Sequence, residues 1–208
     1  MRNLVFVMTL VSMICACTKE SNADRVVKLK YVDGKYEIIC DPISKEEFAE
    51  KFQPGWRCYA IHDIYPDGSI GGNHKDDDWT GTGPGPQEFS VLSDNILKKY
   101  NFWEDEYDHY EYEYIPYHYK ENGNEIIFEA KLGLYHVGYY IGPIGEHRYE
   151  TYDLKSGIVT SLNESKMDLV APLCRAWASE DAIYTLFRFK RLTKEKVAKL
   201  DSLYIEPR

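Results

Sequence analysis

The chain lacks the residue patterns that mark most enzymes and nucleic-acid-binding proteins. It has no HExxH pair, and its six histidines include no close pair at metal-ligand spacing, so we expect no metal site. No GxSxG nucleophile motif occurs. Lys and Arg number 25 against 34 Asp and Glu, for a net charge of −9, and no basic cluster stands out. Such a protein repels phosphate backbones, so we expect no nucleic-acid partner. We also expect no cofactor and no catalytic activity.

Long apolar runs are also scarce, because only the segment from Leu4 to Ile14 is one, and it follows Arg2. A basic residue before a short apolar run predicts a secretory signal peptide over residues 1–16 rather than a membrane-spanning helix. The alternative is a plain signal peptide that is cleaved at a position other than the end of residues 1–16.

The run ends in ICAC at residues 14–17, which resembles a bacterial lipobox. The resemblance implies that Cys17 is lipidated and becomes the first residue, followed by a polar tether over 17–24. Two or three acyl chains there anchor a protein stably to a membrane. No aspartate follows Cys17, which points to the outer membrane, on its periplasmic or its surface side.

Cysteine is rare in the rest of the chain, where only Cys40, Cys58 and Cys174 remain. In an oxidising compartment, one pair can bridge and leave one thiol over. Cys40 and Cys58 flank the first predicted helix and are the favoured pair. Three buried thiols are the alternative, and the sequence does not decide between them.

Short segments of period two, separated by turn signals, predict a mainly β protein of about eight to ten antiparallel strands. Asp33-Gly34 divides residues 25–40 into a hairpin. A capping box at Ser44 predicts a helix over 45–52, and Thr193 begins an amphipathic helix near 194–204. The main predicted strands are 56–65, 89–92, 96–102, 110–119, 126–134, 158–162 and 182–192.

Three local features interrupt these strands. Residues 71–87 (GGNHKDDDWTGTGPGPQ) predict a long loop without secondary structure. The apolar pattern of the 110–119 strand changes face beside Pro116, which predicts a bend or bulge. Lys155-Ser156-Gly157 predicts a turn.

The order of these parts resembles a lipocalin-like β-barrel over residues 44–204, within one domain at 25–208. The resemblance rests on SKEEFAEKF (44–52), on the following QPGWRCYAIHDIYPDGS (53–69) and on YTLFRFKRL (184–192) before the last helix. It implies that Trp56 closes one barrel end beneath Arg188 or Arg191. The hairpin at 25–43 is additional. A β-sandwich is the alternative fold.

Tyrosine is the abundant residue, with 18 in the chain. Phenol rings combine an apolar face with a polar rim and are suited to lining a cavity for an amphipathic ligand. Cross-strand aromatic pairing is the alternative explanation. Acidic residues at 76–78 and 104–113 are interpreted as solvated charge, with Glu111 and Glu113 on the wet face of an edge strand. The candidate ligand-binding residues are Tyr112, Tyr114, Tyr117, Tyr139 and Trp79.

These observations favour a membrane-anchored, non-catalytic lipoprotein that binds a small-molecule, lipid or glycan ligand. One alternative is an accessory or structural subunit of a protein complex in the cell envelope. A second is a small hydrolase that draws its carboxylates from residues 104–113.

Overall fold

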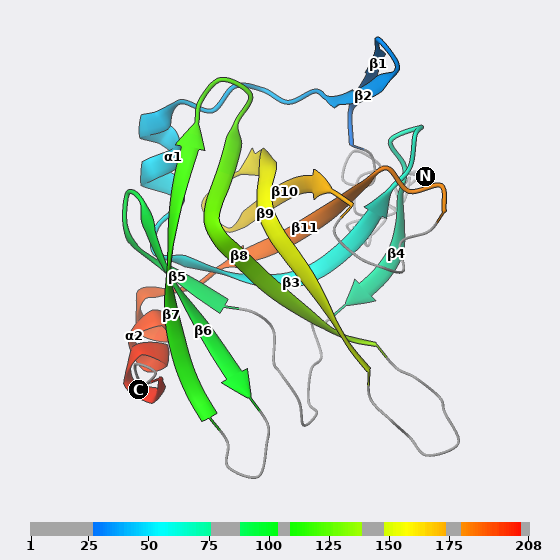
Figure 1. Cartoon of the computed structure of the whole chain (residues 1–208). Helices are drawn as coiled ribbons and strands as arrows, with labels where there is room; N and C mark the ends of the chain where they lie inside the picture. Colours follow the sequence, from blue (N-terminus) through cyan, green and yellow to red (C-terminus); the bar gives the residue numbers. More distant parts are fainter. Residues whose placement is uncertain (1–26, 76–87, 104–108, 139–147, 174–179, 205–208) are drawn as a thin grey trace, which may run out of the picture.

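The computed structural model of the chain describes residues 27–75, 88–103, 109–138, 148–173 and 180–204 (Figure 1). Cys17, the signal peptide, the tether, Trp79, Tyr139 and Cys174 lie outside these ranges. The helices are α1 (Lys45–Lys51) and α2 (Lys194–Leu203). The strands are β1 (Leu29–Val32), β2 (Lys35–Ile38), β3 (Gly55–Ile64), β4 (Ile70–Lys75), β5 (Glu88–Ser93), β6 (Ile96–Trp103), β7 (His109–Lys120), β8 (Glu125–Gly138), β9 (Arg148–Leu162), β10 (Lys166–Pro172) and β11 (Tyr184–Arg191).

Eight antiparallel strands form a closed barrel, in agreement with the predicted fold class and not with the sandwich alternative. The strands from β5 to β11 pair in chain order, and β3 pairs with both β5 and β11. The β3–β11 ladder runs from Trp56 opposite Arg191 to Ile64 opposite Tyr184. This last pairing joins the two ends of the sheet and closes the barrel. The arrangement is consistent with a lipocalin-like barrel.

The hairpin β1–β2 forms a small separate sheet outside the barrel (Figure 1). Asp33 and Gly34 both adopt positive φ, at 49° and 82°, as the two central residues of the predicted hairpin turn require. Its partly buried residues Leu29 and Ile38 pack on Leu186 and other residues of the outer barrel wall.

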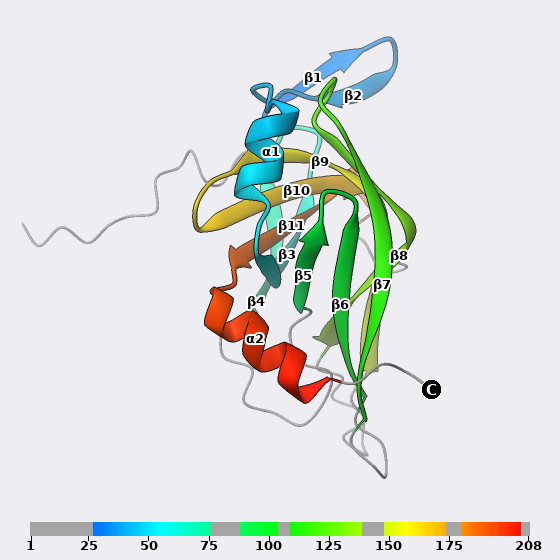
Figure 2. The same cartoon turned by 90° about the vertical axis from the view of Figure 1, so that its left-hand side faces the viewer.

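Helix α1 covers one end of the barrel, which we call the α1 end (Figures 1 and 2). The Ser44 hydroxyl accepts a hydrogen bond from the Glu47 amide and caps the helix as predicted. Phe48 and Phe52 lie one helical turn apart, and both insert into the barrel core. Gly55 then begins β3, where a Cβ atom would lie only 2.5 Å from the Phe89 carbonyl oxygen. The close crossing of β3 and β5 therefore requires glycine.

Helix α2 packs on the outside of the barrel, as Figure 2 shows. The Thr193 hydroxyl accepts from the Lys196 amide at its start, as predicted. Leu200 is buried against Tyr100 on β6, and Asp201 accepts hydrogen bonds from Lys98 and Tyr100. The even-numbered residues of β6 near the helix therefore face outward.

Three predicted interruptions differ from the structure. Ile70–Lys75 forms β4, which pairs with β3, so the predicted loop begins later than expected. The β6–β7 ladder passes through Pro116 without a register shift, whereas the β7–β8 ladder includes only Tyr117–Lys120, so the interruption beside Pro116 is on the β8 side alone. Strand β9 continues through Ser156 and Gly157, so no turn occurs; the β8–β9 register instead shifts between Ile127 and Leu132.

Candidate functional site

The face of β6 and β7 that points into the barrel changes from apolar to polar along its length. Leu97 on β6 and Ile115 on β7 belong to the barrel core. Because successive side chains of a strand alternate between faces, Lys99 and Asn101 share the face of Leu97, and Glu113 and Glu111 share that of Ile115. Both pairs lie beyond Leu97 and Ile115 toward the strand ends at Trp103 and His109. In Figure 1 these ends of β6 and β7 point away from α1, and we call this the distal end.

Lys99 and Glu113 face each other directly across the β6–β7 ladder. The Lys99 ammonium lies 3.0 Å from Glu113 Oε1, and Asn101 Nδ2 donates to the same oxygen at 3.3 Å. The Lys99 side chain is 5% exposed, whereas that of Glu113 is 43% exposed. Solvent therefore reaches the inward-facing carboxylate while its lysine partner stays covered.

Two more polar residues face inward on a different part of the sheet, where β3 and β11 pair. Asp63 on β3 pairs with Thr185 on β11 in the ladder, and both are almost completely buried. Thr185 shares its face with the core residue Phe187. We call Asp63, Lys99, Asn101, Glu111, Glu113 and Thr185 the interior polar group.

Two members of this group hold buried oxygen atoms with unused hydrogen-bonding capacity. Within the described residues, neither Asn101 Oδ1 nor Thr185 Oγ1 has a hydrogen-bond partner. Buried polar atoms are nearly always paired in folded proteins, since an unpaired one costs about 1–3 kcal/mol.

The interior near α1 is filled and apolar. Tyr117 faces inward there, as the candidate-site prediction requires, but its ring packs against Phe52 with centroids 5.4 Å apart and its hydroxyl donates to the Ser93 carbonyl. Burial, followed by the charge of Asp94, raises its pKa. Tyr117 is thus a neutral core residue at the filled end of the barrel.

Tyr112 and Tyr114 face outward, which corrects the expectation that they line an internal cavity. They occupy the even-numbered face of β7, and Tyr112 packs beside α2 with the Lys98 ammonium 4.0 Å from its ring centroid. Tyr114 is half exposed. The remaining candidates, Trp79 and Tyr139, fall outside the described residues.

The glutamates of β7 were expected on the wet face of an edge strand. Among the described residues, β7 pairs with β8 only from Tyr117 to Lys120, so the segment that carries Glu111 and Glu113 pairs with β6 alone. Their side chains share the face of the core residue Ile115. The sequence signal that locates them is the unbroken odd-numbered series that ends in Ile115, Tyr117 and Tyr119.

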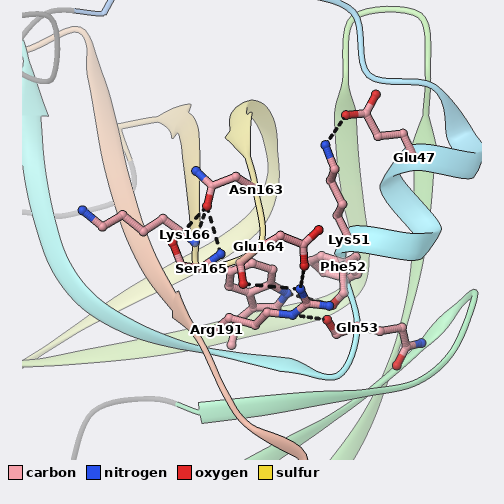
Figure 3. Close-up of polar contacts among 10 residues, drawn as sticks. Glu47, Lys51, Phe52, Gln53, Asn163, Glu164, Ser165, Lys166 and Arg191 are labelled. Carbon is pink, nitrogen blue, oxygen red and sulfur yellow. Dashed lines mark hydrogen bonds and ion pairs between the residues drawn. The ribbon is translucent and has the colours of Figure 1, made fainter.

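Of the two candidate arginines, Arg191 lies near Phe52 and Gln53 at the α1 end (Figure 3) and pairs with Trp56 in the β3–β11 ladder. Its Nε donates to the Gln53 carbonyl at 2.6 Å, and its Nη1 contacts the Glu164 carboxylate. Trp56 is fully buried opposite it, with the indole N–H donating to the Phe52 carbonyl at 2.8 Å. Arg188 instead shares the outer face with Leu186 and lies 3.8 Å from Asp168, so it does not cover Trp56.

Other features of the described residues add no chemistry to the site. Cys40 and Cys58 are not bonded to each other, so the favoured disulfide is not formed. A surface pocket of about 240 Å³ lies outside the barrel. Residues on both sides of the β1–β2 hairpin, among them Val27 and Cys40, form one part of its lining, and Asp168 and Arg188 on the barrel wall form another.

Within the described ranges, no group of three or more His, Cys, Asp or Glu side chains is placed to hold a metal ion. Nor does any described helix have the length and apolarity to cross a membrane.

Comparison with known proteins returns no matching family model, no matching curated protein and no matching solved structure.

Proposed function

We propose that this protein is a lipid-anchored, lipocalin-like binding protein that takes a small or amphipathic ligand at the interior polar group. The observation that carries the proposal is the Lys99–Glu113–Asn101 cluster, which places charged and hydrogen-bonding groups on the inner face of an eight-stranded barrel. A barrel of this strand number is wide enough for its side chains and one small ligand. The packed aromatic residues at the α1 end support this by giving the site a fixed floor.

Anchoring through acyl chains on Cys17 belongs to the same proposal. It places the barrel at the outer membrane of the cell envelope, where the ligand would be met. The support is the lipobox-like ICAC at residues 14–17. A protein partner in the envelope is compatible with this location.

A thermal-shift screen of the full chain against sugars and lipids tests ligand binding. A ligand at a hundred times its Kd stabilises the folded state by about 2.7 kcal/mol. We expect Glu113→Gln to abolish or weaken the shift. Glu129→Gln is the matched control, because Glu129 is exposed on the outside and pairs with His118.

The same screen distinguishes ligand binding inside the barrel from the accessory-subunit alternative. That alternative needs a surface contact, and Tyr114 is a half-exposed aromatic residue on the outer wall. If Tyr114→Ala removes the shift while Glu113→Gln leaves it intact, the ligand binds outside the barrel and the proposal fails.

A carboxylate-based hydrolase is the second candidate function. It is favoured by the placement of Glu111 and Glu113 on the same face of β7, because glycosidases use a pair of carboxyl groups. Turnover of chromogenic glycosides that disappears in both Glu111→Gln and Glu113→Gln would support this function over simple binding.

A further inference from the structure

We infer that the surface pocket between the β1–β2 hairpin and the barrel wall is a second binding site, which takes a free amino acid with a branched aliphatic side chain. The inference is independent of the proposed function, because none of the described lining residues of this pocket belongs to the interior polar group. It follows from how the pocket is built, from the charges of both signs in its lining, and from the aliphatic residues beside them.

The segments on both sides of the hairpin are fixed by hydrogen bonds to other parts of the chain. Before β1, the Val27 amide donates to the Gly68 carbonyl at 2.9 Å. After β2, the Asp41 carbonyl accepts from Asn124 Nδ2 at 2.7 Å. Val27 and Asp41 both line the pocket. Its rim is therefore formed before a ligand binds, which lowers the ordering cost of binding.

The barrel wall of the pocket carries opposite charges on neighbouring strands. Asp168 on β10 lies directly opposite Arg188 on β11 and Ser161 on β9 in the two ladders. The three residues form one row across the outer face, and all of them line the pocket. The Arg188 Nε and Asp168 Oδ2 atoms are 3.8 Å apart, and the two side chains are only 21% and 28% exposed. A partly covered guanidinium and a partly covered carboxylate therefore lie next to each other in this wall.

A β-bulge adds a hydroxyl group to the same wall. The β9–β10 ladder pairs Asp168 with Ser161 and Leu169 with Val159, so Thr160 is the extra residue between them. Thr160 lines the pocket, and its Oγ1 donates to the Asp168 carbonyl at 3.4 Å. A hydroxyl that donates in this way can still accept a hydrogen bond from an ammonium through its lone pairs.

A zwitterion suits this lining better than a ligand with a single charge. A lone carboxylate would meet like charge at Asp168 and Asp41, and a lone ammonium would meet it at Arg188 and Lys28. In an amino acid, the carboxylate can bind the planar fork of Arg188 while the ammonium donates to Asp168. Neighbouring strands are only about 4.8 Å apart, so two heads joined through one carbon atom can reach both side chains.

Aliphatic residues adjoin the charged row and define the rest of the ligand. Leu186 shares the outer face of β11 with Arg188, and Val27 and Ile70 pack against it. Ile39, on the hairpin side of the pocket, is 49% exposed, so an aliphatic ligand would remove apolar surface from water there. The volume of about 240 Å³ is below the range of about 300–1,000 Å³ for drug-sized ligands. We therefore assign a ligand of the size of a single amino acid.

Three probes with one aliphatic group and different heads test the inference. They are L-leucine, 4-methylpentanoate, which lacks the ammonium, and 3-methylbutylamine, which lacks the carboxylate. Each is measured by isothermal titration with the full chain at neutral pH. We expect leucine to bind about tenfold more tightly than either analogue, because each analogue loses one charge-assisted hydrogen bond.

Variants of the wall should weaken the two analogues in opposite patterns. Arg188→Lys keeps the charge but removes the fork, and it should weaken leucine and 4-methylpentanoate about tenfold without affecting 3-methylbutylamine. Asp168→Asn should weaken leucine and 3-methylbutylamine about tenfold and should not weaken 4-methylpentanoate. The matched control is Asp153→Asn, which removes a carboxylate paired with Lys131 away from the pocket and should leave all three affinities unchanged.

An exposed residue of the rim gives a test that does not alter the barrel wall. Lys28 is exposed and lines the pocket, so Lys28→Gln should leave the fold intact, and circular dichroism checks this for every variant. It should weaken leucine and 4-methylpentanoate by about threefold, the size of one exposed charge contact, and leave 3-methylbutylamine unchanged.

Three outcomes would overturn the inference. Leucine may bind with a Kd above about 1 mM, or no more tightly than its analogues. If instead 4-methylpentanoate equals leucine and Arg188→Lys weakens both, the pocket takes carboxylates rather than amino acids. If Glu113→Gln weakens leucine while the wall and rim variants do not, the amino acid binds inside the barrel, and the inference fails while the proposed function stands.

Discussion

Replacing Trp56 by alanine tests whether packing at the α1 end stabilises the barrel. The indole is completely buried, stacks toward Phe52 with ring centroids 6.4 Å apart, and donates its N–H to the Phe52 carbonyl at 2.8 Å. Removing a buried tryptophan side chain costs about 3–5 kcal/mol, through lost burial and the cavity left behind. For a domain of this size, such a loss lowers Tm by on the order of 10 °C.

The conservative variant Trp56→Phe divides this cost into its parts. It retains most of the buried ring but leaves the Phe52 carbonyl without its indole donor, which should cost about 1–2 kcal/mol. Urea denaturation followed by circular dichroism gives both values. A loss below about 1 kcal/mol for Trp56→Ala would show that the end is not packed as described. We also expect Trp79→Ala to lower Tm less than Trp56→Ala does.

Three further predictions concern other parts of the chain. The buried Asn124 side chain accepts a hydrogen bond from the Ile43 amide through Oδ1 and donates one to the Asp41 carbonyl through Nδ2. Asn124→Gly tolerates the φ of 51° and should lower the free energy of unfolding in urea by about 2–3 kcal/mol. An unchanged midpoint would contradict the role of these bonds. Burial, with nearby negative groups, raises the pKa of Tyr119 from 10.0 to about 12. The folded state thus favours the neutral phenol, and the associated stability is complete below pH 10 and lost as pH rises through 12; Tyr119→Phe should flatten the fall of unfolding free energy in that window, and an equal slope would refute this. Cys17→Ala should leave the protein without acyl chains, and metabolic labelling that still detects them would overturn the anchor.

The elements of the fold were largely predictable because their signals are local. Each of these signals depends on a few neighbouring residues, as in the Asp33-Gly34 turn, the helix caps at Ser44 and Thr193, and the alternating strands. Closure of the barrel is different. It depends on pairing between β3 and β11, which lie near opposite ends of the domain, and no local pattern reports such a pairing. The sequence alone therefore left barrel and sandwich open.

The tyrosine-rich strand was misinterpreted because aromatic residues occupy both of its faces. Period two identifies which residues of a strand share a face, but it does not say which face is inside. Outside the barrel, α2 covers the part of β7 where Tyr112 packs. An aromatic residue is therefore as suitable at that outer position as it is in the core. A change of face at Pro116 is expected only if each face of the strand is either apolar or polar along its whole length.

The same assumption hid the candidate site. An unbroken strand that carries Glu111, Glu113, Ile115 and Tyr117 on one inner face must pass from a wet region to a dry one. The transition destabilises the fold, because a lysine side chain as buried as Lys99 requires a charged partner to offset its lost hydration. Glu113 supplies it, and the nearby buried Asn101 Oδ1 has no hydrogen-bond partner among the described residues. A barrel selected only for stability would have apolar side chains at these positions, since replacing a buried ion pair by apolar residues is often neutral or stabilising. The retained polarity is therefore what the proposed binding function would require.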